Sequence, residues 1–365
     1  MTRPTPVEAK PAPAEPGSPG PGRPSRDRDS ITQQSLTVLS RFGLLLLFVV
    51  LVAYFSVERP DSFATFGNAS SLLSAQSVTV IAGLGILLTL ILGEFDLSVA
   101  ANLSLANVFV VTLPERQGVP VWLSIVIAVA ISAGVGLING LVVVFLQVNA
   151  FVATLGMATA LGGMSQLYLG GTDQYVAPTS LTALTRTEWL RLPLSVFYAL
   201  AIAVVLHTVL QYTAVGRRMN AVGGNVRAAR LAGIPADRYR VAAFTAGGLL
   251  AGTAGVVLGA TLGAATSAGN PALLLPIFAA ALLGSTTITP GRFNVPGLLV
   301  AALFLAVAVS GLQQMGVAAW IQPAFNGTAL VVAVALSGWA SRARVAHARR
   351  RQLEAIATQG AATRA

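Results

Sequence analysis

Long apolar segments alternate with short polar segments along most of this chain. A helix needs about 20 apolar residues to cross the roughly 30 Å of hydrocarbon in a bilayer. Ten segments have this length or come close to it, namely residues 42–57, 75–93, 98–113, 121–146, 151–170, 193–212, 239–263, 272–288, 295–313 and 317–338. The pattern predicts an all-α polytopic membrane protein with about ten transmembrane helices.

The arginines between these segments predict the orientation of the chain. The N-terminal tail, the loop at 213–238 and the C-terminal tail are rich in arginine, and ten spans place all three on the cytoplasmic side, where positive segments are retained. We therefore expect both termini in the cytoplasm. Five spans precede the outer segment 171–192 and five follow it, an order compatible with an inverted five-plus-five repeat.

Two polar tails flank the predicted membrane domain. Residues 1–40 begin with eight prolines between Pro4 and Pro24, a composition that favours a disordered cytoplasmic tail because little apolar surface can be buried there. Residues 341–365 form a basic cytoplasmic tail. The membrane domain between them covers residues 41–340 and includes a basic cytoplasmic loop at 213–240.

The composition excludes several kinds of chemistry. Charged residues make up 10% of the 365 residues, whereas an average protein has roughly 25%. The chain has no cysteine and two distant histidines, His207 and His347, so we expect no metal site. Lys10 is the single lysine and lies in no Gly-x-x-x-x-Gly-Lys loop, so the chain has no P-loop for ATP. The net charge of +10 lies mostly in the C-terminal tail and one loop, and nucleic acid is not an expected partner.

Two carboxylates interrupt an apolar region between the second and third predicted spans. Glu94 and Asp96 lie there, followed by Ser98 and Asn102 on one helix face. A charge at the centre of a bilayer costs about 2.5–3.5 kcal/mol. Asp96 or Ser98 can cap the third helix, or the segment can line a solute path as a broken helix, and both interpretations stay open. The glycine pairs Gly248/Gly252 and Gly255/Gly259 indicate close helix packing, within the chain or between two copies.

The cytoplasmic loop contains the signals of a short helix. Asn225 is a favourable N-cap, residues 226–232 have helical character, and Gly233 followed by Pro235 ends the helix. Three alanines, Ala228, Ala229 and Ala232, would give this helix a smooth surface suited to a groove on another protein. The alternative is a solvated basic loop that only fixes the topology.

Three motifs resemble the permease subunits of ribose/xylose-type (monosaccharide) ABC importers, in the branched-chain amino acid/ribose permease superfamily. Residues 93–100, Gly-Glu-Phe-Asp-Leu-Ser-Val-Ala, are similar to the Gly-Gly-Ile-Asp-Leu-Ser-Val-Gly of that family, with Glu94 as an added carboxylate. Residues 151–156 are similar to its Phe-Ile-Ala-Thr-Leu-Gly, and residues 216–234 to the loop that docks on the ATPase. The resemblance covers about residues 75–338.

The resemblance implies a multi-pass subunit of the bacterial cytoplasmic membrane that moves a monosaccharide or related polar solute into the cytoplasm. It implies that the chain is not an enzyme and holds no cofactor, because ATP and Mg bind to separate ABC ATPase subunits. The implied partners are those ATPases, an extracytoplasmic solute-binding protein, a second permease copy in a homodimer or a related permease in a heterodimer, and the lipid bilayer.

The resemblance also assigns two groups of site residues. The implied ATPase-coupling residues are Gly216, Arg217, Asn220, Gly223, Gly224, Asn225, Ala228, Ala229, Arg230 and Gly233. The residues expected in the translocation path or gate are Glu94, Asp96, Ser98 and Asn102.

Two other classes of function stay open at this point. An ion-coupled secondary transporter would use Glu94 and Asp96 as its cation site. The same ABC machinery can also serve branched-chain amino acids or nucleosides, although the triplet Asp96-Leu97-Ser98 resembles the sugar branch. A membrane enzyme is less favoured, because two distant histidines offer no nucleophile–base pair or metal site.

Overall fold

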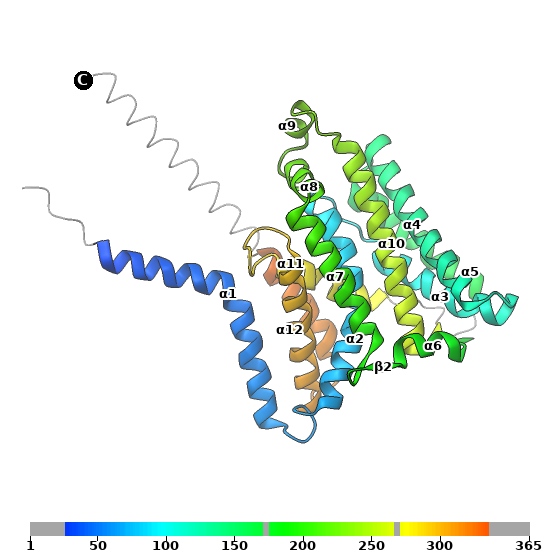
Figure 1. Cartoon of the computed structure of the whole chain (residues 1–365), viewed down its shortest axis with the longest axis horizontal. Coiled ribbons are helices and arrows are strands. Elements are labelled where there is room, and N and C mark those ends of the chain that lie inside the picture. The colour runs from blue at the N-terminus through cyan, green and yellow to red at the C-terminus, as the bar shows by residue number, and fades with distance from the viewer. Residues whose placement is uncertain (1–25, 171–174, 266–270, 336–365) are drawn as a thin grey trace, which may run out of the picture. The chain divides into compact units, whose positions relative to one another are not determined.

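The computed structural model describes residues 26–170, 175–265 and 271–335, with side chains from residue 42 onward (Figure 1). The helices are α1 (Arg26–Glu58), α2 (Phe66–Ile91), α3 (Val99–Gln117), α4 (Val121–Phe145), α5 (Ala150–Leu169), α6 (Thr179–Arg186), α7 (Leu194–Tyr212), α8 (Ala214–Gly224), α9 (Val226–Leu231), α10 (Ala236–Leu262), α11 (Leu274–Gly284) and α12 (Val295–Gln314), with a 3₁₀ turn at Pro271–Leu273. A final apolar helix covers Ile321–Ala335. The all-α prediction is confirmed.

Two short antiparallel strand pairs accompany the helices. Strand β1 (Tyr175–Val176) pairs with β4 (Ala264–Ala265), and β2 (Glu188–Trp189) pairs with β3 (Leu192–Pro193). The first pair joins segments far apart in the sequence, at the end of α10, whereas the second is a local hairpin that leads into α7. Neither pair changes the helical character of the fold.

Among the described residues, six helices are long and apolar enough to cross a membrane, namely α2, α4, α5, α7, α10 and α12. The segments Phe42–Glu58, Pro271–Gly284 and Ile321–Ala335 are shorter apolar helices. The predicted span 75–93 begins too late, because α2 starts at Phe66. Polar residues fill its first turns and hide the helix from an apolar pattern, while the Thr65 side chain accepts a hydrogen bond from Asn68 N and caps it.

The predicted tail boundary at residue 40 differs from the structure. Helix α1 begins at Arg26, so residues 26–40 of the predicted tail are helical in the structure. The physical reason is that all the prolines of the tail precede residue 25, and nothing after them breaks a helix. Residues 1–25 and the predicted tail at 341–365 lie outside the described residues. The chain divides into the units Met1–Leu39 and Ser40–Ala365, and the helices after α1 all belong to the second.

Helices α2 and α10 form the centre of the second unit. The apolar window of α2 is 78% buried and that of α10 is 61% buried, whereas α5 and α7 are 22% and 17% buried. Helix α10 packs against α2, α3 and α4 (Figure 1). The central helices are therefore fixed by neighbours on most sides, and α5 and α7 present most of their surface outward.

Glycines bring the backbones of α4 and α10 into direct contact. A Cβ atom added at Gly136 would lie 2.2 Å from the Phe244 carbonyl oxygen, and one added at Gly248 would lie 2.4 Å from the Ser132 carbonyl oxygen. On the next turns, Gly255 meets the Leu103 backbone of α3 in the same way. The predicted role of these glycines in close packing is confirmed, and the packing lies within one chain.

We expect Gly136→Ala to lower the free energy of unfolding by about 1–3 kcal/mol, because the added methyl group forces two backbones apart. Gly134→Ala is the matched control, since among the described residues nothing lies within 4 Å of a Cβ atom added there. Thermal unfolding of the purified protein in detergent measures the difference. Equal unfolding temperatures for the two variants would contradict the contact.

Candidate functional site: the path loop and the coupling segment

Residues 92–98, here called the path loop, connect the end of α2 to the start of α3. The chain turns at Gly93, which has a left-handed φ of 80° that favours glycine. The Glu94 amide then donates a hydrogen bond back to the Thr89 carbonyl, over 3.0 Å. The path loop is therefore folded against the last turn of α2.

Asp96 and Ser98 bind each other inside the path loop. The Asp96 Oδ1 atom accepts hydrogen bonds from the Ser98 amide (2.9 Å) and from the Ser98 hydroxyl (2.6 Å), and both residues are buried. Burial raises the pKa of the Asp96 carboxyl, and the Ser98 hydrogen bonds oppose this rise. Ser98 occupies the N-cap position of α3, but within the described structure its side chain makes no capping bond. Asp96 thus fixes the residue that precedes the helix, without accepting from an amide of its first turn, and the capping and path-lining roles both stay predictions.

Helices α4 and α5 hold the far end of the path loop. The Asn139 side chain of α4 donates to the Ser98 hydroxyl (2.9 Å), and the Leu97 amide donates to the Thr154 hydroxyl of α5 (3.0 Å). Asn102 is buried on α3 and donates to the Ser132 carbonyl of α4 (3.0 Å). In this conformation Ser98 and Asn102 therefore face neighbouring helices. Thr154 belongs to the segment 151–156 that resembles the Phe-Ile-Ala-Thr-Leu-Gly motif of the family, but sequence analysis assigned it no contact with the path loop.

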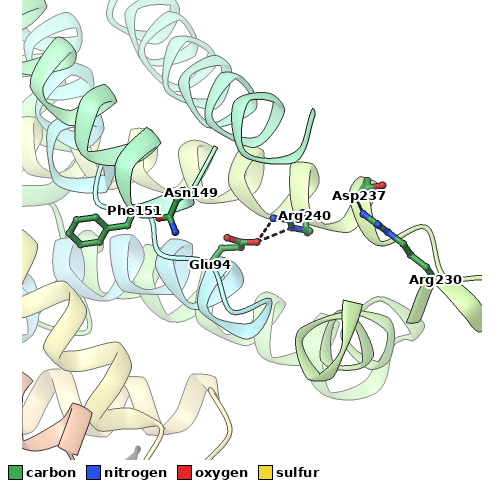
Figure 2. Close-up of polar contacts among 6 residues, drawn as sticks. All are labelled: Glu94, Asn149, Phe151, Arg230, Asp237 and Arg240. Carbon is green, nitrogen blue, oxygen red and sulfur yellow. Dashed lines mark hydrogen bonds and ion pairs between the residues drawn. The ribbon is translucent and has the colours of Figure 1, made fainter. Parts of the chain in front are cut away.

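Glu94 forms an ion pair with Arg240 near the start of α10 (Figure 2). The Arg240 Nε atom donates to Glu94 Oε1 over 2.9 Å, and one terminal nitrogen of the same guanidinium donates to the same oxygen. Each side chain is 17% exposed. Sequence analysis missed Arg240, because its partner lies 146 residues away in the chain.

The short cytoplasmic helix of the prediction is present as α9. The Asn225 side chain accepts a hydrogen bond from the Ala228 amide (3.0 Å), and Gly233 ends the segment with a φ of 78°. The predicted docking surface needs one correction, because Ala229 is buried. It lies on the inner side of the helix, where its carbonyl accepts a hydrogen bond from the Ile234 amide.

The exposed surface of α9 contains a residue that the sequence analysis did not select. Leu231 is 85% exposed, more than any other large hydrophobic residue of the described structure. Ala228 and Ala232 are exposed beside it in the sequence. These three apolar residues, at α9 and its C-cap, are here called the α9 surface, and Arg227 and Arg230 are exposed on the same helix.

Other predicted coupling residues make local contacts in α8 and α9, here together called the coupling segment. The Asn220 side chain donates to the Gly216 carbonyl (2.8 Å), and an Arg217 guanidinium nitrogen donates to the Tyr212 carbonyl (3.5 Å). Arg230 forms an exposed ion pair of 2.6 Å with Asp237 in the first turn of α10. These contacts fix the coupling segment to α7 and α10.

Gly223 joins the coupling segment to the end of α2. A Cβ atom added at Gly223 would lie 1.8 Å from the Ile91 carbonyl oxygen and 3.3 Å from the Leu92 Cα atom. The coupling segment thus touches the chain directly before the path loop. The two predicted groups of site residues, far apart in sequence, are neighbours in the structure.

A polar cavity of about 350 Å³ lies beside this junction. It is lined by Glu94 and Arg240, by Arg230, and by Gln147 and Asn149 from the connection between α4 and α5. Figure 2 shows Glu94 and Arg240 pointing toward each other, with the Arg230–Asp237 pair nearby. The path loop, the coupling segment and the α4–α5 connection therefore meet around one open space.

The apolar helices of the described structure are those of a membrane protein. The chain belongs to the family of branched-chain amino acid transport system permease components, whose family model matches residues 68–334. It is a permease subunit of the bacterial cytoplasmic membrane, and not an enzyme.

Curated relatives cover most of the chain. It is similar to the L-arabinose transport system permease protein AraH of Escherichia coli K12, with 27% identity over 84% of this chain and 92% of that protein. The ribose import permease protein RbsC of the same strain is 29% identical, over 80% and 91% of the two chains. The L-arabinose ABC transporter permease protein AraH of Azospirillum brasilense is 30% identical, over 81% and 87%. No solved structure matches the chain.

We expect Gly223→Ala to detach the coupling segment from α2, because the added methyl group would overlap the Ile91 carbonyl. The expected result is faster hydrogen exchange in α8 and at the end of α2. Gly224→Ala is the neighbouring control, because no described atom lies within 4 Å of a Cβ atom added there. Unchanged exchange in Gly223→Ala would show that this contact does not hold the two segments together.

Proposed function

We propose that this chain moves a monosaccharide or a related polar solute into the cytoplasm as the permease subunit of an ABC importer. The relatives named as arabinose and ribose permeases support the solute class. The observation that carries the coupling role is the α9 surface, an apolar patch with Leu231 85% exposed, on a helix that is capped at Asn225 and tied to α10 through Arg230.

The proposed topology has ten spans with both termini in the cytoplasm. Support comes from the positive charge of the coupling segment and of both tails. Each of the ten predicted segments also overlaps a helix in the described part of the chain. In this orientation the coupling segment, the path loop and the polar cavity lie at the cytoplasmic end. The inverted five-plus-five repeat remains part of the proposal.

The α9 surface is the proposed contact with a separate ABC ATPase, which binds ATP and Mg. Ala228, Leu231 and Ala232 are exposed together on this segment, and a contiguous exposed apolar patch favours a protein partner. Gly216, Gly223 and Gly233 shape the backbone of the segment, while Asn225 and Arg230 fix its ends. A solute-binding protein on the outer side completes the proposed importer, as the membership in a transport-system permease family suggests.

A second copy of the permease is the proposed partner of α5. Its outward face carries Gly156, Thr159, Gly163 and Gln166, which are all exposed. These residues share one helix face by their spacing, and small and polar residues on a membrane helix favour helix–helix contact over lipid. We therefore place the homodimer contact and the solute path along this face of α5.

The ion-coupled alternative has weaker support. Its two proposed cation ligands are engaged by other groups, Glu94 by Arg240 and Asp96 by Ser98. Branched-chain amino acids stay a second candidate solute class, because the family description refers to them. Nucleosides have no observation in their favour.

Uptake of radiolabelled L-arabinose and D-ribose tests the solute class. The complete importer, reconstituted in liposomes with its ATPase and binding protein, is expected to accumulate one of these sugars when ATP is enclosed. Leucine serves as the comparison solute. Accumulation of leucine without either sugar would favour the amino acid class. Sugar uptake that requires an ion gradient and no ATP would overturn the ABC importer.

We expect Leu231→Asp to abolish the stimulation of ATPase activity by the loaded binding protein, because a carboxylate on the α9 surface cannot enter an apolar groove without losing its hydration. Thr289→Asp adds the same charge at an exposed position outside the coupling segment, and it should leave the stimulation intact. Normal stimulation in Leu231→Asp would refute the docking role of the α9 surface.

A further inference from the structure

We propose that the Glu94–Arg240 ion pair is the positioning contact through which α10 moves the path loop during the transport cycle. The pair thus acts on the gate through the backbone of the path loop, and Glu94 is not a solute ligand. The inference rests on the proposed function, because it names the route by which movement of the coupling segment reaches the path.

The first step of this route joins α9 to α10. Arg230 at the end of α9 pairs with Asp237, and Arg240 follows one helical turn later on α10. Because Asp237 and Arg240 lie three residues apart on one helix, they share a face and move as one body. A displacement of α9 is therefore carried to the guanidinium group of Arg240.

The second step joins α10 to the path loop. Both Arg240 hydrogen bonds end on one oxygen of Glu94, and each side chain is largely withdrawn from solvent at 17% exposure. A charge-assisted pair of this kind is shorter and more directional than a neutral contact. Gly93 directly before Glu94 has a left-handed φ of 80°, and among the described residues nothing lies within 4 Å of a Cβ atom added there. The path loop can therefore turn about Gly93 when Arg240 moves.

The third step joins the path loop to α5. Leu97 donates its amide to Thr154 on the inner side of α5, and Ser98 accepts from Asn139 on α4. The outward face of α5 is the proposed path face. A movement that enters the path loop at Glu94 thus reaches α5 at Thr154, on the side of the helix opposite the face along which solute would pass.

The polar cavity gives this pair room to move. Glu94 and Arg240 both line its wall, and the cavity of about 350 Å³ can take up a side-chain displacement without opening the packed core. By contrast, α10 contacts α4 backbone to backbone at Gly136 and Gly248. When the end of α10 near Arg240 moves, it therefore moves mainly relative to the path loop and little relative to α4.

Single-cysteine fluorescence tests the route, because the chain has no cysteine of its own. Arg227→Cys on α9, outside the α9 surface, and Phe95→Cys in the path loop are exposed positions for a bimane label, which is attached before the importer is reconstituted with its ATPase. ATP with orthovanadate is then added, and the emission shift is recorded at each position. With the ion pair intact, we expect a shift at both positions.

Removing the pair should separate the two signals. In Glu94→Gln and in Arg240→Gln, we expect the shift at position 227 to remain and the shift at position 95 to disappear. The reversed pair, Glu94→Arg with Arg240→Glu, should restore the shift at position 95, which a merely structural loss would not do. Arg292→Gln removes a positive charge from an exposed position elsewhere and should leave both shifts unchanged.

The possible failures can be told apart. A shift at position 95 that survives in both single variants would overturn the positioning role. Loss of both shifts in a folded Glu94→Gln protein would also overturn it, because the pair would then act on docking. Absence of any shift at position 227 in the protein with the intact pair would instead overturn the proposed ATPase coupling. If the single variants do not fold, failure of the reversed pair to give a shift at position 95 decides against the route.

Discussion

The contact between the backbones of α4 and α10 is the constraint on which the rest of this structure depends. In a bilayer, apolar side chains gain little by leaving lipid, so helices associate through close packing and hydrogen bonds. Gly136 and Gly248 remove the side chains that would separate the two helices, and dispersion contacts then extend along the crossing. Helix α10 becomes a central and largely buried element. Its inner end carries Asp237 and Arg240 out of this packed region, toward the coupling segment and the path loop.

A second constraint is that polar groups in apolar surroundings require partners. The path loop satisfies it through contacts with several helices. Asp96 binds Ser98, Ser98 accepts from Asn139, and Leu97 donates to Thr154. The same hydrogen bonds that offset the cost of burial also connect the loop to α4 and α5. The hydrogen bonds that make the polar path loop tolerable in a membrane therefore also couple the position of this loop to α4 and α5.

The sequence predicts those parts of the structure that local chemistry decides. Asn225 and Gly233 delimit α9 nearly to the residue, because capping and left-handed termination act within one turn. The start of α2 was missed, because capping at Thr65 and tertiary packing support a polar first turn that an apolar pattern does not include. Sequence does not predict that Ala229 is buried or that Glu94 pairs with Arg240. Both features depend on contacts between segments that are far apart in the sequence. No spacing within a single chain segment encodes such contacts.

The added carboxylate at Glu94 is best understood together with Arg240. A lone carboxylate at the edge of a membrane span would be unfavourable, and a lone arginine there would be as well. Together they form a pair whose net contribution to stability is small, because the attraction between the charges mainly offsets their desolvation. Such a pair adds little to the stability of the contact, but it makes the contact specific, since it fixes which surfaces meet and in what register. That property suits a contact that forms and breaks, as proposed between α10 and the path loop. The glycine-packed crossing of α4 and α10 suits a contact that stays in place. The two kinds of contact on the same helix divide α10 into a fixed central part and an inner end able to move.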